Sequence, residues 1–190
     1  EAGKWFGPQW TGTRVLLLTE ALNVIQDGGV TLIEQKAGDA ATCVTILREG
    51  NLINKVVVQS FNWNYLRDFH RLEPHQALGA LGPPRTRNGR KLKDEEKILD
   101  QIWIDQVRQF GARVVVWNRQ ITREAVAYAH RLGLKVWVYT VDDPIVAEQL
   151  LDQDVDGIIS NNPSIIWRTF ALRFSRSKTI ARSARQMFSR

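Results

Sequence analysis

The sequence predicts an α/β fold built on a parallel β-sheet. Short apolar runs rich in β-branched residues alternate repeatedly with segments of helical periodicity, and the links between them are short. The runs 56–58 and 114–116 are apolar on successive residues, which is typical of strands buried on both faces. An open doubly wound sheet and part of a (β/α)8 barrel both fit this alternation.

Several of the predicted strands end in polar or aromatic side chains. These are Glu34 and Lys36, Ser60 and Phe61, Trp117 and Asn118, Tyr139 and Thr140, and Ser160 and Asn161. A (β/α)8 barrel gathers such residues into one site, because the carboxyl ends of its strands meet at one end. No Gly-x-Gly-x-x-Gly turn or Walker loop is present, so a nucleotide-binding fold has no support.

The first part of the chain is predicted to hold a loop, a short helix and a strand. Residues 1–14 mix glycines with aromatic residues, which predicts a loop folded onto the surface of the body. Thr19 is the predicted cap of a helix over 20–25, which the glycines at 28–29 end. The strand 31–36 follows.

The middle of the chain continues the alternation, with a helix at 39–49 and a strand at 55–61. A helix over 62–72 is predicted from an apolar residue at every third position, namely Trp63, Leu66, Phe69 and Leu72. Small apolar residues at 76–81 predict a strand, and a polar loop extends to residue 94.

The last part begins with a predicted helix over 95–110, with Ile98, Ile102 and Val107 facing inward. Strands are expected at 113–117, 135–141 and 155–161, with helices at 122–132 and 144–151 between them. Gly133 is the expected stop of the first of these two helices. Trp63, Trp103 and Trp167 are expected to be core residues of helices.

The net charge of +6 lies in the C-terminal tail. Residues 171–190 contain six basic residues and no acidic one, so basic and acidic residues balance in the rest of the chain. We therefore do not expect a nucleic-acid partner. Cys43 is the single cysteine, which excludes an intrachain disulfide and a multi-cysteine zinc site.

The run Thr31-Leu32-Ile33-Glu34-Gln35-Lys36 organises the chain. Residues i and i+2 of a strand point to the same face, so Glu34 and Lys36 project together where an apolar strand meets solvent. A binding or catalytic site is one interpretation of this pair. A surface ion pair with little energetic value is the other.

Four motifs in order resemble the glycerophosphodiester phosphodiesterase family. They are Ile33-Glu34-Gln35-Lys36, Ser60-Phe61, Tyr139-Thr140-Val141-Asp142, and Asp156-Gly157-Ile158-Ile159-Ser160-Asn161-Asn162-Pro163. The segment Ala2-Gly3-Lys4-Trp5-Phe6 is similar to a small insertion that precedes the first motif in that family. The resemblance implies a (β/α)8 barrel of the TIM type.

The family's His-Arg-Gly, Glu-x-Asp and His-Asp strands have no counterpart here and would lie upstream of Glu1. The resemblance therefore implies a barrel incomplete at its N-terminus over 1–167, followed by a basic tail over 168–190. Tyr139, Asp142 and Ser160-Asn161 replace the family's Trp, Asn and Thr-Asp.

The resemblance also implies metal-assisted hydrolysis of glycerophosphodiesters to glycerol 3-phosphate and an alcohol. Glu34 corresponds to a ligand of a divalent cation, Mg²⁺ or Ca²⁺, and Lys36 to a catalytic phosphate contact. Phe61, Trp117 and Tyr139 are the expected substrate-binding residues. The family's general acid and base are histidines of the absent strands, and we do not expect His70, His75 or His130 to replace them.

An alternative is a non-catalytic truncated barrel that binds a ligand or partner. A third interpretation assigns function to the basic tail, as an amphipathic helix that contacts an anionic membrane or a partner helix, or as a module that binds nucleic acid. A solvated tail end is the simpler expectation.

Overall fold

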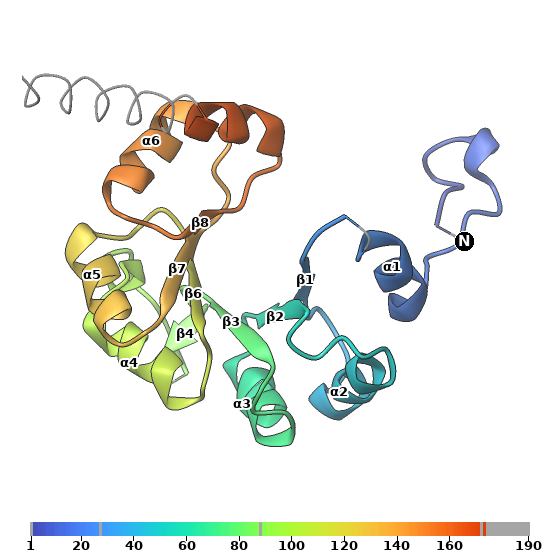
Figure 1. Cartoon of the computed structure of the whole chain (residues 1–190), viewed down its shortest axis with the longest axis horizontal. Coiled ribbons are helices and arrows are strands. Elements are labelled where there is room, and N and C mark those ends of the chain that lie inside the picture. Colours follow the sequence, from blue (N-terminus) through green and yellow to red (C-terminus); the bar gives the residue numbers. More distant parts are fainter. Residues whose placement is uncertain (1, 27, 88, 172, 174–190) are drawn as a thin grey trace, which may run out of the picture.

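A single parallel sheet forms the centre of the computed structural model, which describes residues 2–26, 28–87, 89–171 and 173. Six strands lie in the order β1-β2-β3-β6-β7-β8, and every neighbouring pair is parallel. The sheet curves into an open half-barrel with helices along its convex side (Figure 1). Because the strand order never reverses, the sheet is of the barrel type and not doubly wound.

The strands agree with the sequence predictions in place and are shorter at their ends. They are β1 (Thr31–Glu34), β2 (Val56–Ser60), β3 (Ala77–Leu81), β6 (Val114–Trp117), β7 (Lys135–Val138) and β8 (Gly157–Ile158). In the register Glu34 lies opposite Gln59, and Gln59 opposite Gly79. These three positions therefore share one face of the sheet.

Six helices alternate with the strands in the described residues. They are α1 (Leu18–Ile25), α2 (Ala40–Glu49), α3 (Trp63–Leu72), α4 (Gln101–Gln109), α5 (Arg123–Arg131) and α6 (Pro144–Asp152). Residues 163–171 are also helical. Polar side chains cap five of the helices: Asp39, Asn62, Asp100, Thr122 and Asp143 each accept a hydrogen bond from the first turn.

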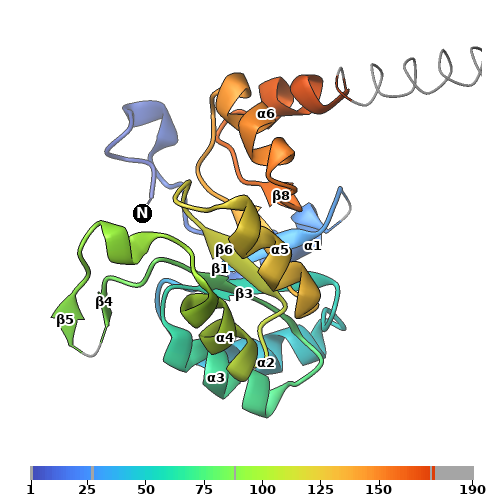
Figure 2. The same ribbon diagram turned by 90° about the vertical axis from the view of Figure 1, so that its left-hand side faces the viewer.

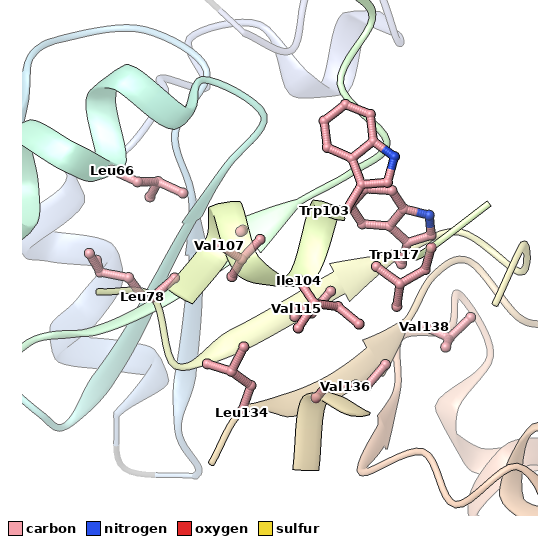
Figure 3. Close-up of a cluster of buried hydrophobic side chains, with 14 of the residues drawn as sticks. Leu66, Leu78, Trp103, Ile104, Val107, Val115, Trp117, Leu134, Val136 and Val138 are labelled. Atoms are coloured by element: carbon pink, nitrogen blue, oxygen red, sulfur yellow. The ribbon is translucent and has the colours of Figure 1, made fainter. Parts of the chain in front are cut away.

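The main core lies between the sheet and the helices on its convex side. Leu78, Val115 and Val136 point from the strands toward Leu66 and Ile104 of the helices (Figure 3). A smaller apolar cluster covers the opposite, concave face, with Leu81, Val114 and Val116 at its centre and Trp137, Tyr139 and Ile159 against it. Adjacent residues of one strand thus face different layers.

Three features of the middle and end of the chain differ from prediction. The helix expected over 95–110 is a 3-10 turn, Glu95–Lys97, followed by α4, and Ile98 and Ile102 are exposed. The backbone N–H of Leu99 donates to the carbonyl of Gln120, which pulls this residue out of helical geometry and buries its side chain. The loop before residue 94 contains a hairpin, β4 (Thr86–Arg87) and β5 (Arg90–Lys91).

The aromatic residues of the N-terminal segment do not pack on the body as expected. Trp5 is 83% exposed and Phe6 67%, and the segment projects away from the sheet (Figures 1 and 2). Trp167 is also exposed, because Ile166 and Phe170 supply the inward face of the helical stretch 163–171. Trp63 and Trp103 are buried as predicted.

No helix of the described residues is long and apolar enough to cross a membrane. The helical stretch 163–171 includes residue 167, where the boundary between the barrel and the basic tail is expected. Residues 174–190, where most of the predicted basic tail falls, lie outside the described residues.

Candidate functional site

Glu34 and Lys36 form an ion pair at the carboxyl end of β1. Lys36 Nζ donates to Glu34 Oε1, so the two side chains project together as the strand periodicity predicts. The Glu34 side chain is 29% exposed and that of Lys36 76%. A half-open pocket of about 290 Å³ borders both residues and continues to Asp39 and Tyr65. The pair is thus accessible to a ligand.

Gln59 lies next to Glu34 on the same face of the sheet. Its side chain is buried, and its Oε1 has no hydrogen-bond partner. Gly79 on the neighbouring strand leaves room for it, because a Cβ there would stand 3.2 Å from Gln59 Cβ and 3.1 Å from Val116 Cγ2. Sequence reasoning missed Gln59, although a polar residue interrupting an apolar strand was the available signal.

Tyr139 follows β7 and reaches across to the end of β3. Its hydroxyl donates to the carbonyl of Gly82 at 2.6 Å. Burial, together with the negative charge of Glu34, raises the pKa of Tyr139 to about 12. The phenol therefore remains a proton donor at neutral pH. Its ring meets Phe61, which follows β2, edge to face with centroids 6.0 Å apart.

Trp117 lies on the other side of the sheet from Tyr139. Its ring is fully buried in the main core, 5.9 Å from the ring of Trp103, and its indole N–H donates to the carbonyl of Lys97 (Figure 3). The structure thus brings Glu34, Lys36, Phe61 and Tyr139 to one end of the sheet and keeps Trp117 among the helices. The strand alternation that places Val116 on the concave face explains this separation.

Ser60 and the three histidines take structural positions. Ser60 is buried, and its hydroxyl donates to Gln35 and accepts from the N–H of Asn62, which ties the ends of β1 and β2 together. His70 packs against Gly111 before β6, and His75 precedes β3. His130 contacts Asp156 before β8. All three therefore lie at the amino ends of the strands, opposite the candidate site.

Comparison with known families identifies the barrel. The model of the glycerophosphoryl diester phosphodiesterase family matches residues 2–165. The chain belongs to this family. A glycerophosphodiester phosphodiesterase of Caldanaerobacter subterraneus is 26% identical over 173 residues, covering 87% of this chain and 66% of the relative. A probable glycerophosphodiester phosphodiesterase of Mycobacterium tuberculosis is 25% identical and covers 82% and 60%.

Solved structures of the family share the fold. A phosphodiesterase of Oleispira antarctica in complex with the product sn-glycerol-3-phosphate superposes with a TM-score of 0.70 at 21% identity, covering 88% of this chain and 66% of that one. A putative glycerophosphoryl diester phosphodiesterase of Silicibacter pomeroyi gives 0.66 at 23% identity, with coverages of 88% and 62%. This chain therefore spans less than two thirds of the length of these relatives.

Enzymes of this family typically use a divalent metal ion. Among the described residues no group of three or more His, Cys, Asp or Glu side chains could hold one. A hard cation takes six or more oxygen ligands in most protein sites, including several carboxylates or waters. Two carboxylates border the pocket, Glu34 and Asp39, and Asp39 already accepts hydrogen bonds from Thr42. The described residues therefore do not form a metal site by themselves.

Proposed function

We propose that this chain forms part of a glycerophosphodiester phosphodiesterase that hydrolyses its substrate to glycerol 3-phosphate and an alcohol. The observation that carries the proposal is the Glu34–Lys36 pair at the carboxyl end of β1, the end at which barrel enzymes place their chemistry. Membership of the family supports the reaction class. The bound product in the Oleispira antarctica phosphodiesterase supports a glycerophosphate-binding site in this fold.

In this proposal Lys36 contacts the phosphate of the substrate. A phosphodiester carries a negative charge that repels a nucleophile, and a fixed ammonium offsets the charge that builds up in the transition state. Lys36 is exposed and flexible enough to exchange its partner from Glu34 to a phosphate oxygen. Phe61 and the Tyr139 ring would form the apolar wall against the glycerol moiety.

Glu34 is proposed as one ligand of Mg²⁺ or Ca²⁺. Oxygen ligands favour these hard cations over zinc. The remaining ligands and the proton-transfer pair would come from the part of the barrel that this chain does not span. We likewise propose 1–167 as the barrel portion and 168–190 as the tail, the first residues of which continue the helical stretch 163–171 against the core.

A second candidate function is a binding protein without turnover. The observation that favours it is the position of the three histidines, all remote from Glu34 at the opposite ends of the strands. Such a protein would bind glycerol 3-phosphate or a related phosphate ester through Lys36 and release it unchanged.

The test is hydrolysis of glycerophosphocholine with Mg²⁺ or Ca²⁺, measured for this chain and for a chimera in which the N-terminal third of the Caldanaerobacter relative precedes it. Lys36→Ala and Glu34→Gln should each lower kcat/KM of the active form by about 100-fold or more. Lys55→Ala removes an exposed lysine at the amino end of β2 and serves as the control.

Activity of the chimera that depends on Glu34 and Lys36 would support the proposal. Glycerol 3-phosphate binding without hydrolysis in either form would favour the binding protein. Equal activity of Lys36→Ala and the control would contradict the proposed contact between Lys36 and the substrate phosphate.

A further inference from the structure

A second pocket lies beside the candidate site, at the carboxyl ends of β2 and β3. It has a volume of about 700 Å³ and is bounded by the start of α3, the chain after β3 and one side of α4. Three arginines line it, Arg67, Arg85 and Arg87, and no acidic residue does. Phe61 belongs to this pocket and to the candidate site, since it lines the pocket and its ring contacts Tyr139.

The aromatic floor of this pocket is held rigidly. The Trp63 indole N–H donates to the carbonyl of Leu81 at 2.9 Å, and that of Trp103 to the carbonyl of Glu96 at 3.0 Å. The two rings meet edge to face with centroids 5.7 Å apart. Both indoles are buried, so the pocket exists before any ligand arrives.

Aromatic rings orient two of the three arginines, and no carboxylate of the described residues neutralises any of them. The Arg87 guanidinium lies 4.8 Å above the ring of Trp103, and that of Arg67 lies 5.5 Å above the ring of Phe110. Arg67 also donates to Asn64 Oδ1 at 2.6 Å, which is a neutral acceptor. Within the described part of the chain none of the three arginines forms an ion pair, in contrast to Arg90 on the same hairpin, which pairs with Glu96.

Three unpaired guanidinium groups around a preformed cavity favour an anionic ligand. Stacking on an aromatic ring fixes the plane of a guanidinium and leaves its N–H groups free for bidentate contacts to phosphate or carboxylate oxygens. The same charge disfavours a cationic group such as choline. Asn62, Asn64 and Gln106 add neutral hydrogen-bonding groups to the lining.

We propose that this pocket is an anion subsite for the alcohol half of the substrate, which would carry a second phosphate or a carboxylate. The assignment rests on the proposed function, because the neighbouring site around Lys36 must hold the phosphodiester that is cleaved. The shared residue Phe61 places the two sites side by side at one end of the sheet. The preferred substrates are then glycerophosphodiesters with an anionic head group.

Binding is tested first, without reference to hydrolysis. Isothermal titration calorimetry with inorganic pyrophosphate measures Kd for the unaltered protein and for Arg85→Ala, Arg87→Ala and Arg123→Ala. Loss of one charge-assisted contact should weaken binding about tenfold or more for the first two variants. Arg123 is an exposed arginine on α5 outside the pocket, so its removal should change Kd less than about twofold. Equal effects of all three variants would overturn the assignment.

Substrate preference is tested second, in the form that hydrolyses glycerophosphocholine. The ratio of kcat/KM for glycerophosphoinositol 4-phosphate to that for glycerophosphocholine should fall about tenfold or more in Arg85→Ala and recover partly in Arg85→Lys. An unchanged ratio despite weaker pyrophosphate binding would mean that the pocket holds a free anion, which overturns the head-group assignment. Arginine-dependent pyrophosphate binding in a protein of which neither the chain nor the chimera hydrolyses glycerophosphocholine would support the anion pocket and count against the phosphodiesterase function.

Discussion

Gly82 determines how the end of β3 approaches the core and the candidate site. A Cβ at this position would overlap Cζ3 of Trp117, so the backbone can lie against the indole only without a side chain. The carbonyl of the same residue accepts the hydrogen bond of the Tyr139 hydroxyl, and its N–H donates to the carbonyl of Val116. One glycine thus links the buried tryptophan to the proposed substrate wall.

We expect Gly82→Ala to destabilise the fold by about 1–3 kcal/mol, because the added methyl group must displace a ring in a packed core. A backbone shift at residue 82 should also move the carbonyl that accepts the hydrogen bond of the Tyr139 hydroxyl. Urea denaturation measures the free energy of unfolding, and Gly29→Ala is the control, at a glycine with open space around its Cβ position and no positive φ. An unchanged stability of Gly82→Ala would show that Trp117 can move aside.

Two buried glutamines allow a matched comparison. Gln59 Oε1 has no partner, whereas Gln76 donates to the carbonyl of Val56 at 2.6 Å and accepts from the N–H of Asn54. We expect Gln59→Met to raise the free energy of unfolding by about 1 kcal/mol and Gln76→Met to lower it by about 1–3 kcal/mol. Urea denaturation measures both. A loss of stability in Gln59→Met equal to that in Gln76→Met would contradict the assignment of an unpartnered oxygen.

At the scale of the secondary structure elements, α1 is the least well capped helix. Its N-cap is Leu17, which has no side-chain acceptor, whereas the predicted cap Thr19 lies inside the helix. Glu20 Oε2 accepts from the N–H of Leu17 at 2.8 Å, and the Glu20 carboxylate pairs with Arg14. Half of a capping box is therefore present.

We expect Leu17→Thr to stabilise the protein by about 1 kcal/mol, because the threonine hydroxyl can accept a hydrogen bond from the first turn. Leu17 is 65% exposed, so little apolar contact is lost. Thermal denaturation measures the change, with Leu16→Thr as the control at a neighbouring exposed leucine outside the cap position. Equal shifts for the two variants would exclude capping as the cause.

Asp156 joins α5 to the amino ends of β7 and β8. It accepts from Lys135 Nζ at 2.7 Å, from the N–H of Val136 at 2.8 Å and from His130 Nε2 at 2.7 Å, while Asp154 lies 3.8 Å from His130 Nδ1. Burial alone would raise the pKa of Asp156, but these donors outweigh it and hold the pKa below its usual range. The carboxylate is therefore more acidic in the folded than in the unfolded chain.

A carboxyl group with a depressed pKa in the folded state stabilises the protein at pH values above its pKa in the unfolded chain, about 3.9. This contribution is lost as the pH falls through the pKa of the folded state. We expect Asp156→Asn to be less stable than the unaltered protein at pH 7, and the difference to shrink as the pH falls below about 4. Denaturant titrations across this range measure it. A difference that is constant with pH would exclude the charge as its source.

At the scale of the whole molecule, the half-barrel leaves two strand edges unpaired within the described residues, β1 and β8. Exposed apolar residues accompany the first edge, including Val30, which is 75% exposed just before β1. Unpaired edges with apolar neighbours favour pairing with another chain. The relatives, which are longer, match this chain over 60–66% of their length.

We expect the isolated chain to associate as its concentration rises, and Val30→Lys to reduce this association several-fold, because a charge beside an edge strand opposes pairing. Sedimentation velocity measures the associated fraction. Val24→Lys places the same charge at an equally exposed site on α1 and is the control. A monomer at all concentrations would contradict the role of the open edge.

The sequence by itself determined the order of strands and helices and the place of the candidate pair. These features depend on local sequence. Alternate residues of β1 share a face, the Thr122 hydroxyl caps the start of α5, and Gly133 follows its end with a positive φ that suits a residue without a Cβ. The family motifs also lie within single strand ends, so they could be recognised without knowledge of their neighbours in space.

Tertiary structure alone decided which residues meet. The predicted helix over 95–110 is interrupted because Leu99 pairs with Gln120, a partner 21 residues away. Trp117 and Tyr139 both end strands, so the sequence predicts one shared site, but register and alternation place the two side chains on opposite faces of the sheet. The arginine pocket is lined by residues of α3, of the β4–β5 hairpin and of α4. These segments are far apart in the sequence, so no local pattern predicts that they meet. Propensity acts over a few residues, whereas these contacts are fixed by packing between distant segments.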